Sequence, residues 1–224
     1  MQQKPSLAAQ HDERVTLAAY GDSLVAGWGL STQDGLVARL EAELVKAGAG
    51  GARGVRVLDF GVSGDTSLDG LERLEEVLAA KPRAVLLEFG ANDCYQGLPL
   101  DETRDALYKM ISALRAAGIA VFVAGWRTSM DLFKPYDDPD LAGLVPLAPP
   151  LYTEEYVERF NRMHVELARR LDVPCMAHIL DSLEGQGGCY QADGVHPSAK
   201  GAAILAQALA PLLLPLLAEP APAE

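Results

Sequence analysis

Short apolar runs alternate along this chain with longer segments in which apolar residues recur every three or four positions. Five runs have the length expected of β-strands: 15–20, 55–60, 84–89, 119–124 and 173–177. Five segments have the apolar spacing expected of amphipathic helices: 34–47, 67–80, 102–117, 154–171 and 198–214. This alternation predicts an α/β fold, a three-layer α/β/α sandwich around a five-stranded, mostly parallel sheet.

The 224 residues contain no internal repeat and no linker that would divide them. A chain of this length can build one substantial core and is short for two. We therefore expect a single domain over 15–217, between a flexible leader at 1–14 and a flexible tail at 218–224.

The sequence offers no export or membrane-spanning signal. Met1 to Arg14 is polar and lacks the apolar centre of a signal peptide. We expect a cytoplasmic protein as written, or a periplasmic or secreted one if a leader has been removed. The apolar stretch Ile204 to Leu217 is interrupted by Pro211 and Pro215 and is too short to span a bilayer, so it predicts a packed terminal helix.

The chain is acidic: 31 Asp and Glu residues against 19 Lys and Arg residues give a formal net charge of −12. Such a surface repels phosphate backbones, so we expect no nucleic-acid partner. The three cysteines, Cys94, Cys175 and Cys189, form no CxxC pair. This pattern argues against a disulfide framework or a structural zinc site, and predicts free thiols and no metal.

Four segments hold polar residues that could take part in catalysis. Three of them follow the first three predicted strands, and the fourth precedes the last predicted helix. They are Gly21-Asp22-Ser23-Leu24, Gly61 to Thr66, Gly90 to Asp93, and Asp193 to Pro197. Because loops at the carboxyl ends of parallel strands share one edge of the sheet, we expect the four segments to meet. Together they supply a hydroxyl, hydrogen-bond donors and an Asp-x-x-His pair, the inventory for acyl transfer.

The chemistry of such a set is well defined. A serine hydroxyl becomes a useful nucleophile when a neighbouring imidazole takes its proton. An aspartate three residues before the histidine can hold the other ring nitrogen and stabilise the imidazolium. An unshielded glycine N–H and an asparagine amide can stabilise the oxyanion of the tetrahedral intermediate.

The four segments resemble the four sequence blocks of the SGNH/GDSL hydrolase family, and most closely its bacterial branch of thioesterase I, lysophospholipase and arylesterase enzymes. The phrases Gly64-Asp65-Thr66-Ser67 and Leu71-Glu72-Arg73-Leu74 also resemble that branch, and the likeness runs from about Val15 to Leu209. It implies the flavodoxin-like SGNH hydrolase fold.

The resemblance also implies roles for individual residues. Ser23 would be the nucleophile, and Asp193 and His196 would complete the triad. The N–H of Ser23, Gly64 and Asn92 would form the oxyanion hole. The expected reaction is hydrolysis of a small-molecule acyl ester or thioester with a short to medium acyl chain, and aryl esters are among the expected substrates. It would proceed through an acyl-enzyme intermediate and without a cofactor.

The stretch from Trp126 to Thr153 is longer than is usual for this branch and holds several large apolar residues. Because it leaves the same edge of the sheet, we expect it to line the substrate pocket, through Trp126, Met130, Phe133, Leu144 and Val145. A subunit contact in a homo-oligomer is the alternative.

Other histidines and an aspartate favour structural interpretations. Asp22 is expected to form a local turn. His164, among charged neighbours on a predicted helix, is expected on a solvated face, and His178 to be buried with its hydrogen bonds made.

The glycine-rich segment 48–54 has Arg53 at the third glycine position of a dinucleotide loop and precedes a strand, so it predicts only a connection. The G-x-S-x-G elbow of α/β-hydrolases is absent.

The same triad would also serve a carbohydrate O-acetyl esterase, and a non-catalytic scaffold is the alternative outside enzymes.

Overall fold

The computed structural model describes residues 12–133 and 152–218. Its centre is a five-stranded sheet in the order β2-β1-β3-β4-β5, in which every neighbouring pair is parallel. The strands are β1 Val15–Gly21, β2 Val55–Gly61, β3 Ala84–Glu88, β4 Ala120–Ala124 and β5 Cys175–Met176. The predicted α/β fold class is confirmed.

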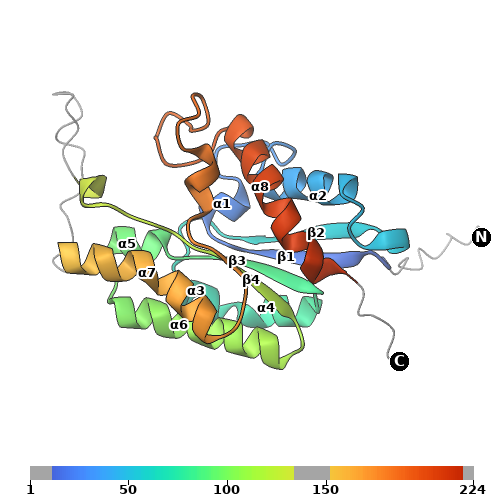
Figure 1. Ribbon diagram of the computed structural model, residues 1–224, viewed down its shortest axis with the longest axis horizontal. Coiled ribbons are helices and arrows are strands. Elements are labelled where there is room, and N and C mark those ends of the chain that lie inside the picture. The colour runs from blue at the N-terminus through green and yellow to red at the C-terminus, as the bar shows by residue number, and fades with distance from the viewer. Residues whose placement is uncertain (1–11, 134–151, 219–224) are drawn as a thin grey trace, which may run out of the picture.

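Helices cover both faces of the sheet (Figure 1). On one face lie α2 Leu36–Lys46 and α8 Ala199–Leu217, which pack against each other. On the other lie α3 Ser67–Glu72, α4 Leu74–Ala80, α6 Leu100–Ala116 and α7 Glu154–Arg170. Two short helices, α1 Ser23–Ala26 and α5 Ala91–Gln96, directly follow β1 and β3, and a 3₁₀ turn, Ile179–Leu183, contacts α8.

The register of the central strands aligns their carboxyl ends. Gly21 at the end of β1 pairs with Gly61 of β2 on one side and with Glu88 of β3 on the other. β3 is buried along its whole length, which explains its unbroken apolar sequence. The loops that leave these three strands therefore start side by side, as the sequence analysis expects.

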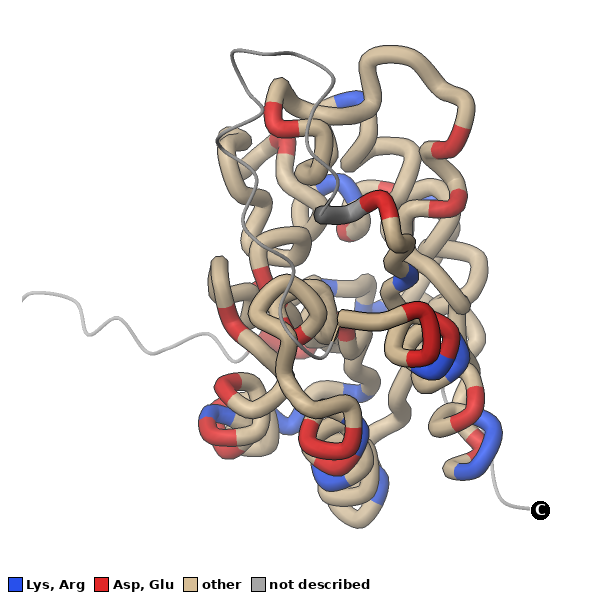
Figure 2. The backbone as a smooth tube through the Cα atoms, turned by 90° about the vertical axis from the view of Figure 1, so that its left-hand side faces the viewer, with Lys and Arg blue, Asp and Glu red and all other residues tan. Residues whose placement is uncertain are grey.

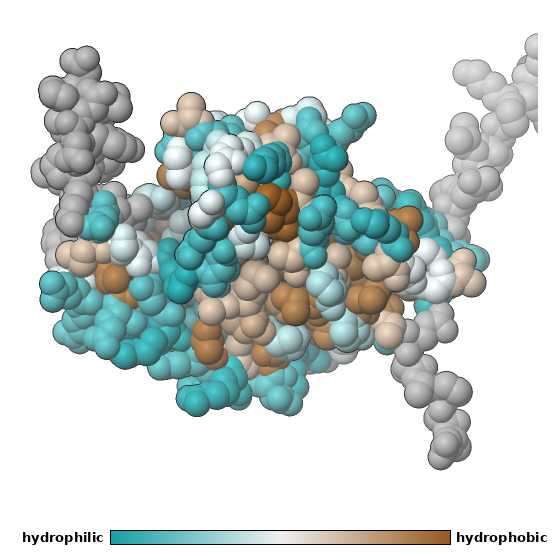
Figure 3. Space-filling view, turned by 45° about the horizontal axis from the view of Figure 1, so that its top comes forward, coloured by the Kyte–Doolittle hydropathy of each residue, from teal (hydrophilic) through white to brown (hydrophobic). Residues whose placement is uncertain are grey.

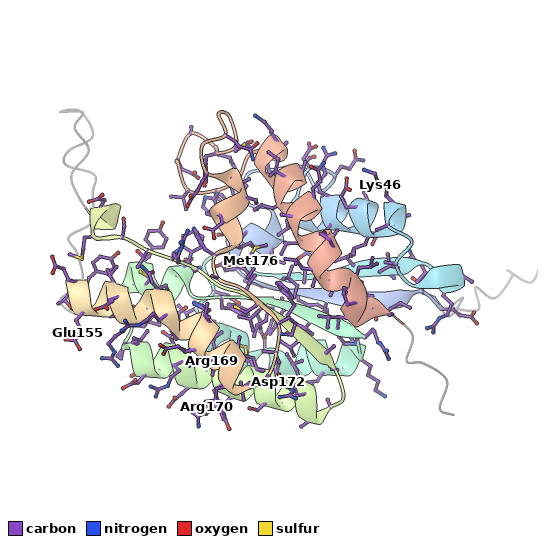
Figure 4. All side chains as sticks on the ribbon, viewed as in Figure 1. Lys46, Glu155, Arg169, Arg170, Asp172 and Met176 are labelled. Carbon is purple, nitrogen blue, oxygen red and sulfur yellow. The ribbon has the colours of Figure 1, made fainter. Side chains whose placement is uncertain are left out.

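The helix faces follow the sequence pattern. Leu36, Leu40 and Leu44 form the buried stripe of α2. Helix α7 begins with acidic residues, including Glu155, and ends with Arg169 and Arg170, an arrangement that complements the helix dipole (Figure 4). Acidic and basic residues lie close together on the helices in the lower half of Figure 2. Within α7, Arg162 forms an ion pair with Glu158.

One predicted helix is two. The segment 67–80 breaks at Arg73, which joins α3 to α4 with φ −101° and ψ 14°. The N-cap of α3 is Thr66, and it forms a capping box with Asp69. The prediction of a continuous helix was wrong because the contacts of the Arg73 side chain, described below, compete with helix propensity.

Helix α8 is longer than predicted and continues through Pro211 and Pro215 to Leu217. By length and composition alone it could cross a membrane, so the expectation that this region is too short was wrong. It packs along one face as a core helix does, burying Gly201, Ala202, Leu205, Ala206, Leu209, Ala210, Leu213 and Leu217. Leu212 of this helix is exposed. Other apolar residues also reach the surface in the view of Figure 3.

Candidate active site

Ser23 is the first residue of α1, immediately after β1. Asp22 caps this helix: its Oδ1 accepts a hydrogen bond from the Leu24 N–H at 3.0 Å, so the expected turn-forming role is confirmed. Gly21 allows the turn, because a Cβ there would lie 2.4 Å from the backbone oxygen of Glu88. The strand-to-helix turn thus places Ser23 at the carboxyl end of β1.

A continuous chain of hydrogen bonds joins Ser23 to His196 and Asp193. His196 Nε2 lies 2.9 Å from Ser23 Oγ, and His196 Nδ1 lies 2.7 Å from Asp193 Oδ2. With the ring proton on Nδ1, the imidazole donates to Asp193 and accepts from the Ser23 hydroxyl. The three residues, 173 positions apart at their extremes, therefore have the geometry of a nucleophile, a base and a residue that orients the base.

Asp193 is held in its ionised form. Partial burial acts to raise its pKa, but the hydrogen bonds from the His196 ring and from the backbone N–H groups of Val195 and His196 outweigh that effect. The pKa of Asp193 therefore lies below its usual range. Its side chain is 41% exposed, so water also solvates the charge.

The loop that carries His196 is tied to the loop after α1. Tyr190 and Pro197 form an antiparallel bridge, and Gln191 Nε2 donates to the backbone oxygens of Pro197 and Trp28. The Trp28 ring lies beside the His196 ring, with centroids 6.1 Å apart, and Trp28 is 55% exposed. An exposed tryptophan next to the site was missed in the sequence analysis, although its place five residues after Ser23 could have indicated it.

Gly64 lies in a tight turn after β2. The Asp65 N–H donates to the Val62 carbonyl at 3.2 Å, and Gly64 has φ +91°, which favours glycine. The turn is anchored to β1, because the Val62 N–H donates to the Gly21 carbonyl at 3.1 Å. The N–H groups of Ser23 and Gly64 take no part in the hydrogen bonds among the described residues, so both are available to an oxyanion.

Asn92, in the first turn of α5, reaches toward both neighbouring loops. Its Nδ2 donates to Asp65 O at 2.9 Å and to Asp22 Oδ2 at 3.2 Å. The structure thus brings Asn92 next to the Ser23 turn and the Gly64 turn, as predicted. Asn92 Nδ2 therefore has two protein acceptors.

A group of buried carboxyls lies beneath Ser23, and it was not predicted. Asp22, Glu88 and Asp93 are each 0% exposed. Asp93 accepts hydrogen bonds from the backbone N–H and the hydroxyl of Ser67. Burial, and then the charge of Asp22, raises the pKa of Glu88 well above its usual range, and burial also raises the pKa of Asp22. The sequence signal was Glu88 itself, a single acid at the end of a strand covered on both faces.

The pocket residues expected from the long stretch are only partly described. Trp126 is buried with its ring edge-on to His178, at a centroid distance of 5.3 Å, and Met130 is exposed. Phe133 ends the 3₁₀ turn Met130–Phe133. Leu144 and Val145 lie outside the described residues.

The prediction for His164 was wrong. It is 1% exposed, and its Nε2 lies 2.9 Å from the Phe89 carbonyl. Burial lowers its pKa, which favours a neutral ring. The spacing from Phe160 to His164 is that of one helix face and could have revealed it. His178 is half-buried and accepts from the Arg127 N–H at 3.1 Å.

Sequence comparison places these segments in a family. Residues 19–204 match the profile of the GDSL-like Lipase/Acylhydrolase family. The chain belongs to this family. The resemblance inferred from the four blocks is therefore confirmed, and with it the prediction of an ester hydrolase.

Two characterised relatives cover most of the chain. Esterase TesA of Pseudomonas aeruginosa is 32% identical over 212 residues, covering 94% of both chains. The arylesterase of Vibrio mimicus is 30% identical, covering 86% of this chain and 84% of its own. Among solved structures, that of the SGNH-hydrolase family esterase AlinE4 superposes with a TM-score of 0.66 at 29% identity, covering 92% of this chain and 98% of its own. These matches extend over nearly the whole fold.

Proposed function

We propose that this protein hydrolyses short- to medium-chain acyl esters, including aryl esters and thioesters, through an acyl-enzyme intermediate on Ser23. The observation that carries the proposal is the unbroken hydrogen-bond chain Ser23–His196–Asp193, with links of 2.9 and 2.7 Å. The names of related proteins, esterase, arylesterase and thioesterase 1, support acyl transfer to water as the shared chemistry.

The first step acylates the enzyme. Ser23 Oγ attacks the acyl carbonyl carbon while His196 Nε2 takes the hydroxyl proton. Asp193 stabilises the imidazolium that forms, because its carboxylate stays ionised and accepts from Nδ1. The tetrahedral intermediate then expels the alcohol or thiol, which takes the proton from His196.

The second step releases the acid. Water gives a proton to His196 and attacks the acyl carbonyl, and the new intermediate expels Ser23 Oγ, which takes that proton back. The carboxylic acid leaves and the site returns to its starting state. All proton transfers use side chains already present, so no cofactor enters the reaction.

The N–H groups of Ser23 and Gly64 and the amide of Asn92 would stabilise both oxyanions. The two backbone donors are preorganised by the α1 turn and the Gly64 turn. Asn92 would redirect one amide hydrogen from Asp22, its longer hydrogen bond at 3.2 Å, toward the substrate oxygen. The hydrogen bond to the Asp65 carbonyl at 2.9 Å would hold the amide in place.

Initial rates on p-nitrophenyl esters from acetate to dodecanoate test the proposal, with Ser23→Ala measured beside the wild type. We expect the variant to lose turnover by at least ~10³-fold and to keep its fold by circular dichroism. Undiminished hydrolysis by Ser23→Ala would contradict the mechanism. Activity on acetylated xylan but on no p-nitrophenyl ester would instead assign the triad to a carbohydrate O-acetyl esterase, and no reaction with a fluorophosphonate probe would indicate a scaffold.

A further inference from the structure

We propose that Arg73 is a positioning residue for ester hydrolysis, because its guanidinium fastens the turn that carries Gly64 to the strand end that carries Ser23. The inference rests on the proposed function and extends it to a residue on another element of the fold. Arg73 is far from Ser23 in the sequence, at the break between α3 and α4.

The guanidinium binds one group on each of three neighbouring segments. Nη2 donates to the Gly21 carbonyl at the end of β1 at 3.0 Å, and Nη1 donates to the Phe60 carbonyl of β2 at 2.9 Å. Nε donates to Asp65 Oδ2 at 2.6 Å. One side chain therefore spans the ends of two strands and the turn that follows the second.

The side chain is fixed in this position. It is 15% exposed, and its Cζ lies 4.6 Å from the centroid of the Tyr20 ring and 5.9 Å from that of Phe89. Both rings are buried and meet edge to face, at a centroid distance of 5.0 Å. A planar guanidinium can stack on these rings while it donates in three directions, which a lysine ammonium cannot reproduce.

Asp65 transmits the position of Arg73 to the oxyanion donors. Its carboxylate accepts from Arg73, its N–H closes the turn around Gly64, and its carbonyl accepts from Asn92. The Gly21 carbonyl accepts from both Arg73 and the Val62 N–H at the start of the same turn. Loss of the guanidinium would release Asp65 and with it the alignment of Gly64 and Asn92, and misplacement of about 1 Å can cost on the order of 10²-fold in rate.

The test compares Arg73→Gln and Arg73→Lys with Arg83→Gln as control. Arg83 also donates to a backbone carbonyl, that of Ala218, but at the opposite edge of the sheet. Active sites are titrated with a fluorophosphonate over a long incubation, and kcat and KM for p-nitrophenyl butyrate are expressed per titrated site. The thermal midpoint of each variant is recorded.

We expect Arg73→Gln to lower kcat about 10- to 100-fold with KM changed by less than about threefold, because only donors to the oxyanion are misplaced. Arg73→Lys should recover part of this loss. Arg83→Gln should stay within about twofold of wild type. A kcat per site for Arg73→Gln within twofold of wild type, or a loss confined to KM, would overturn the proposal.

A second variant covers the case in which Arg73→Gln does not fold. Asp65→Asn removes the ion pair but keeps the backbone carbonyl that binds Asn92, and it should lower kcat several-fold without a matching change in KM. Unchanged kcat in that variant would also overturn the proposal. If the wild type hydrolyses no ester, the proposed function is refuted. If the wild type hydrolyses esters and Ser23→Ala does not, an unchanged kcat in the Arg73 variants refutes this inference alone.

Discussion

Two carboxyl groups near Ser23 lie in different environments, which differ in exposure, hydrogen bonding and the direction of the pKa shift. Asp193 is 41% exposed, accepts three hydrogen bonds and has a lowered pKa. Glu88 is completely buried beside Asp22 and has a pKa raised well above its usual range. The environment of Asp193 favours the ionised carboxylate, and the environment of Glu88 favours the protonated acid.

The comparison shows that the surroundings of each carboxyl group, more than its residue type, determine which protonation state is favoured. Hydrogen-bond donors and water favour the charge of Asp193, which the imidazolium needs. Exclusion of water and the neighbouring charge of Asp22 suppress ionisation of Glu88. The same change, carboxyl to amide, should therefore have a large effect on turnover at Asp193 and a small one at Glu88.

Asp193→Asn should produce the larger of the two effects. An amide can hold the wrong tautomer of His196 and cannot stabilise the imidazolium, so kcat should fall on the order of 10³- to 10⁴-fold. Substrate binding should change much less, because the hydrogen bonds that Asp193 accepts come from the His196 ring and from the backbone of its own loop. Steady-state kinetics on p-nitrophenyl butyrate measure both, and a change confined to KM would show that Asp193 does not orient the base.

Asn92→Ala probes the point at which the two environments meet, since its amide bonds Asp22 on the buried side. Loss of one oxyanion donor should lower kcat on the order of 10²- to 10³-fold. If kcat falls by less than twofold in a correctly folded variant, Asn92 is not an oxyanion donor.

The pH dependence of stability should differ between the wild type and Glu88→Gln. Below the pKa of glutamate in the unfolded chain, about 4.3, both states carry the proton and Glu88 contributes its full stability. As the pH rises, the unfolded chain loses that proton first, so the wild type loses stability relative to Glu88→Gln until the folded pKa is passed, by at most about 1.4 kcal/mol per pH unit. Urea unfolding from pH 5 to 8 measures this, and parallel curves would show that Glu88 is ionised in the folded state.

Glu88→Gln at neutral pH should have the smallest effect on turnover. Glutamine is close in shape to a protonated glutamate, so kcat should stay within about threefold of wild type. The matched measurement on Asp193→Asn makes the contrast direct. A loss in Glu88→Gln as large as that in Asp193→Asn would mean that a charge at Glu88 takes part in catalysis.

The part of the site that the sequence predicts is the part carried by strand ends. Ser23, Gly64 and Asn92 each follow a short apolar run by a few residues, and parallel strands bring such positions to one edge. Asp193 and His196 are close in sequence, so their contact is local. These relations depend on chain order and strand direction, which the apolar pattern already contains.

What the sequence did not predict depends on contacts between distant segments. Leu71 to Leu74 are good helix formers, so nothing local marks the break at Arg73, which coincides with contacts to two strand ends. The buried state of Glu88 likewise follows from the layers on both sides of β3. His164 differs, because its place on the buried face of α7 was readable from the spacing and was outweighed by its charged neighbours.

The separation of 173 residues between Ser23 and His196 has a consequence during synthesis of the protein on the ribosome. Ser23, the proposed nucleophile, is made early, and His196, its proposed base, only after all five strands have been synthesised. Under the proposed mechanism, Ser23 of a nascent chain has no base, and hydrolytic activity begins only when the segment around His196 packs against the loop after β1. An activity assay on this protein is, for that reason, also a measure of completed folding.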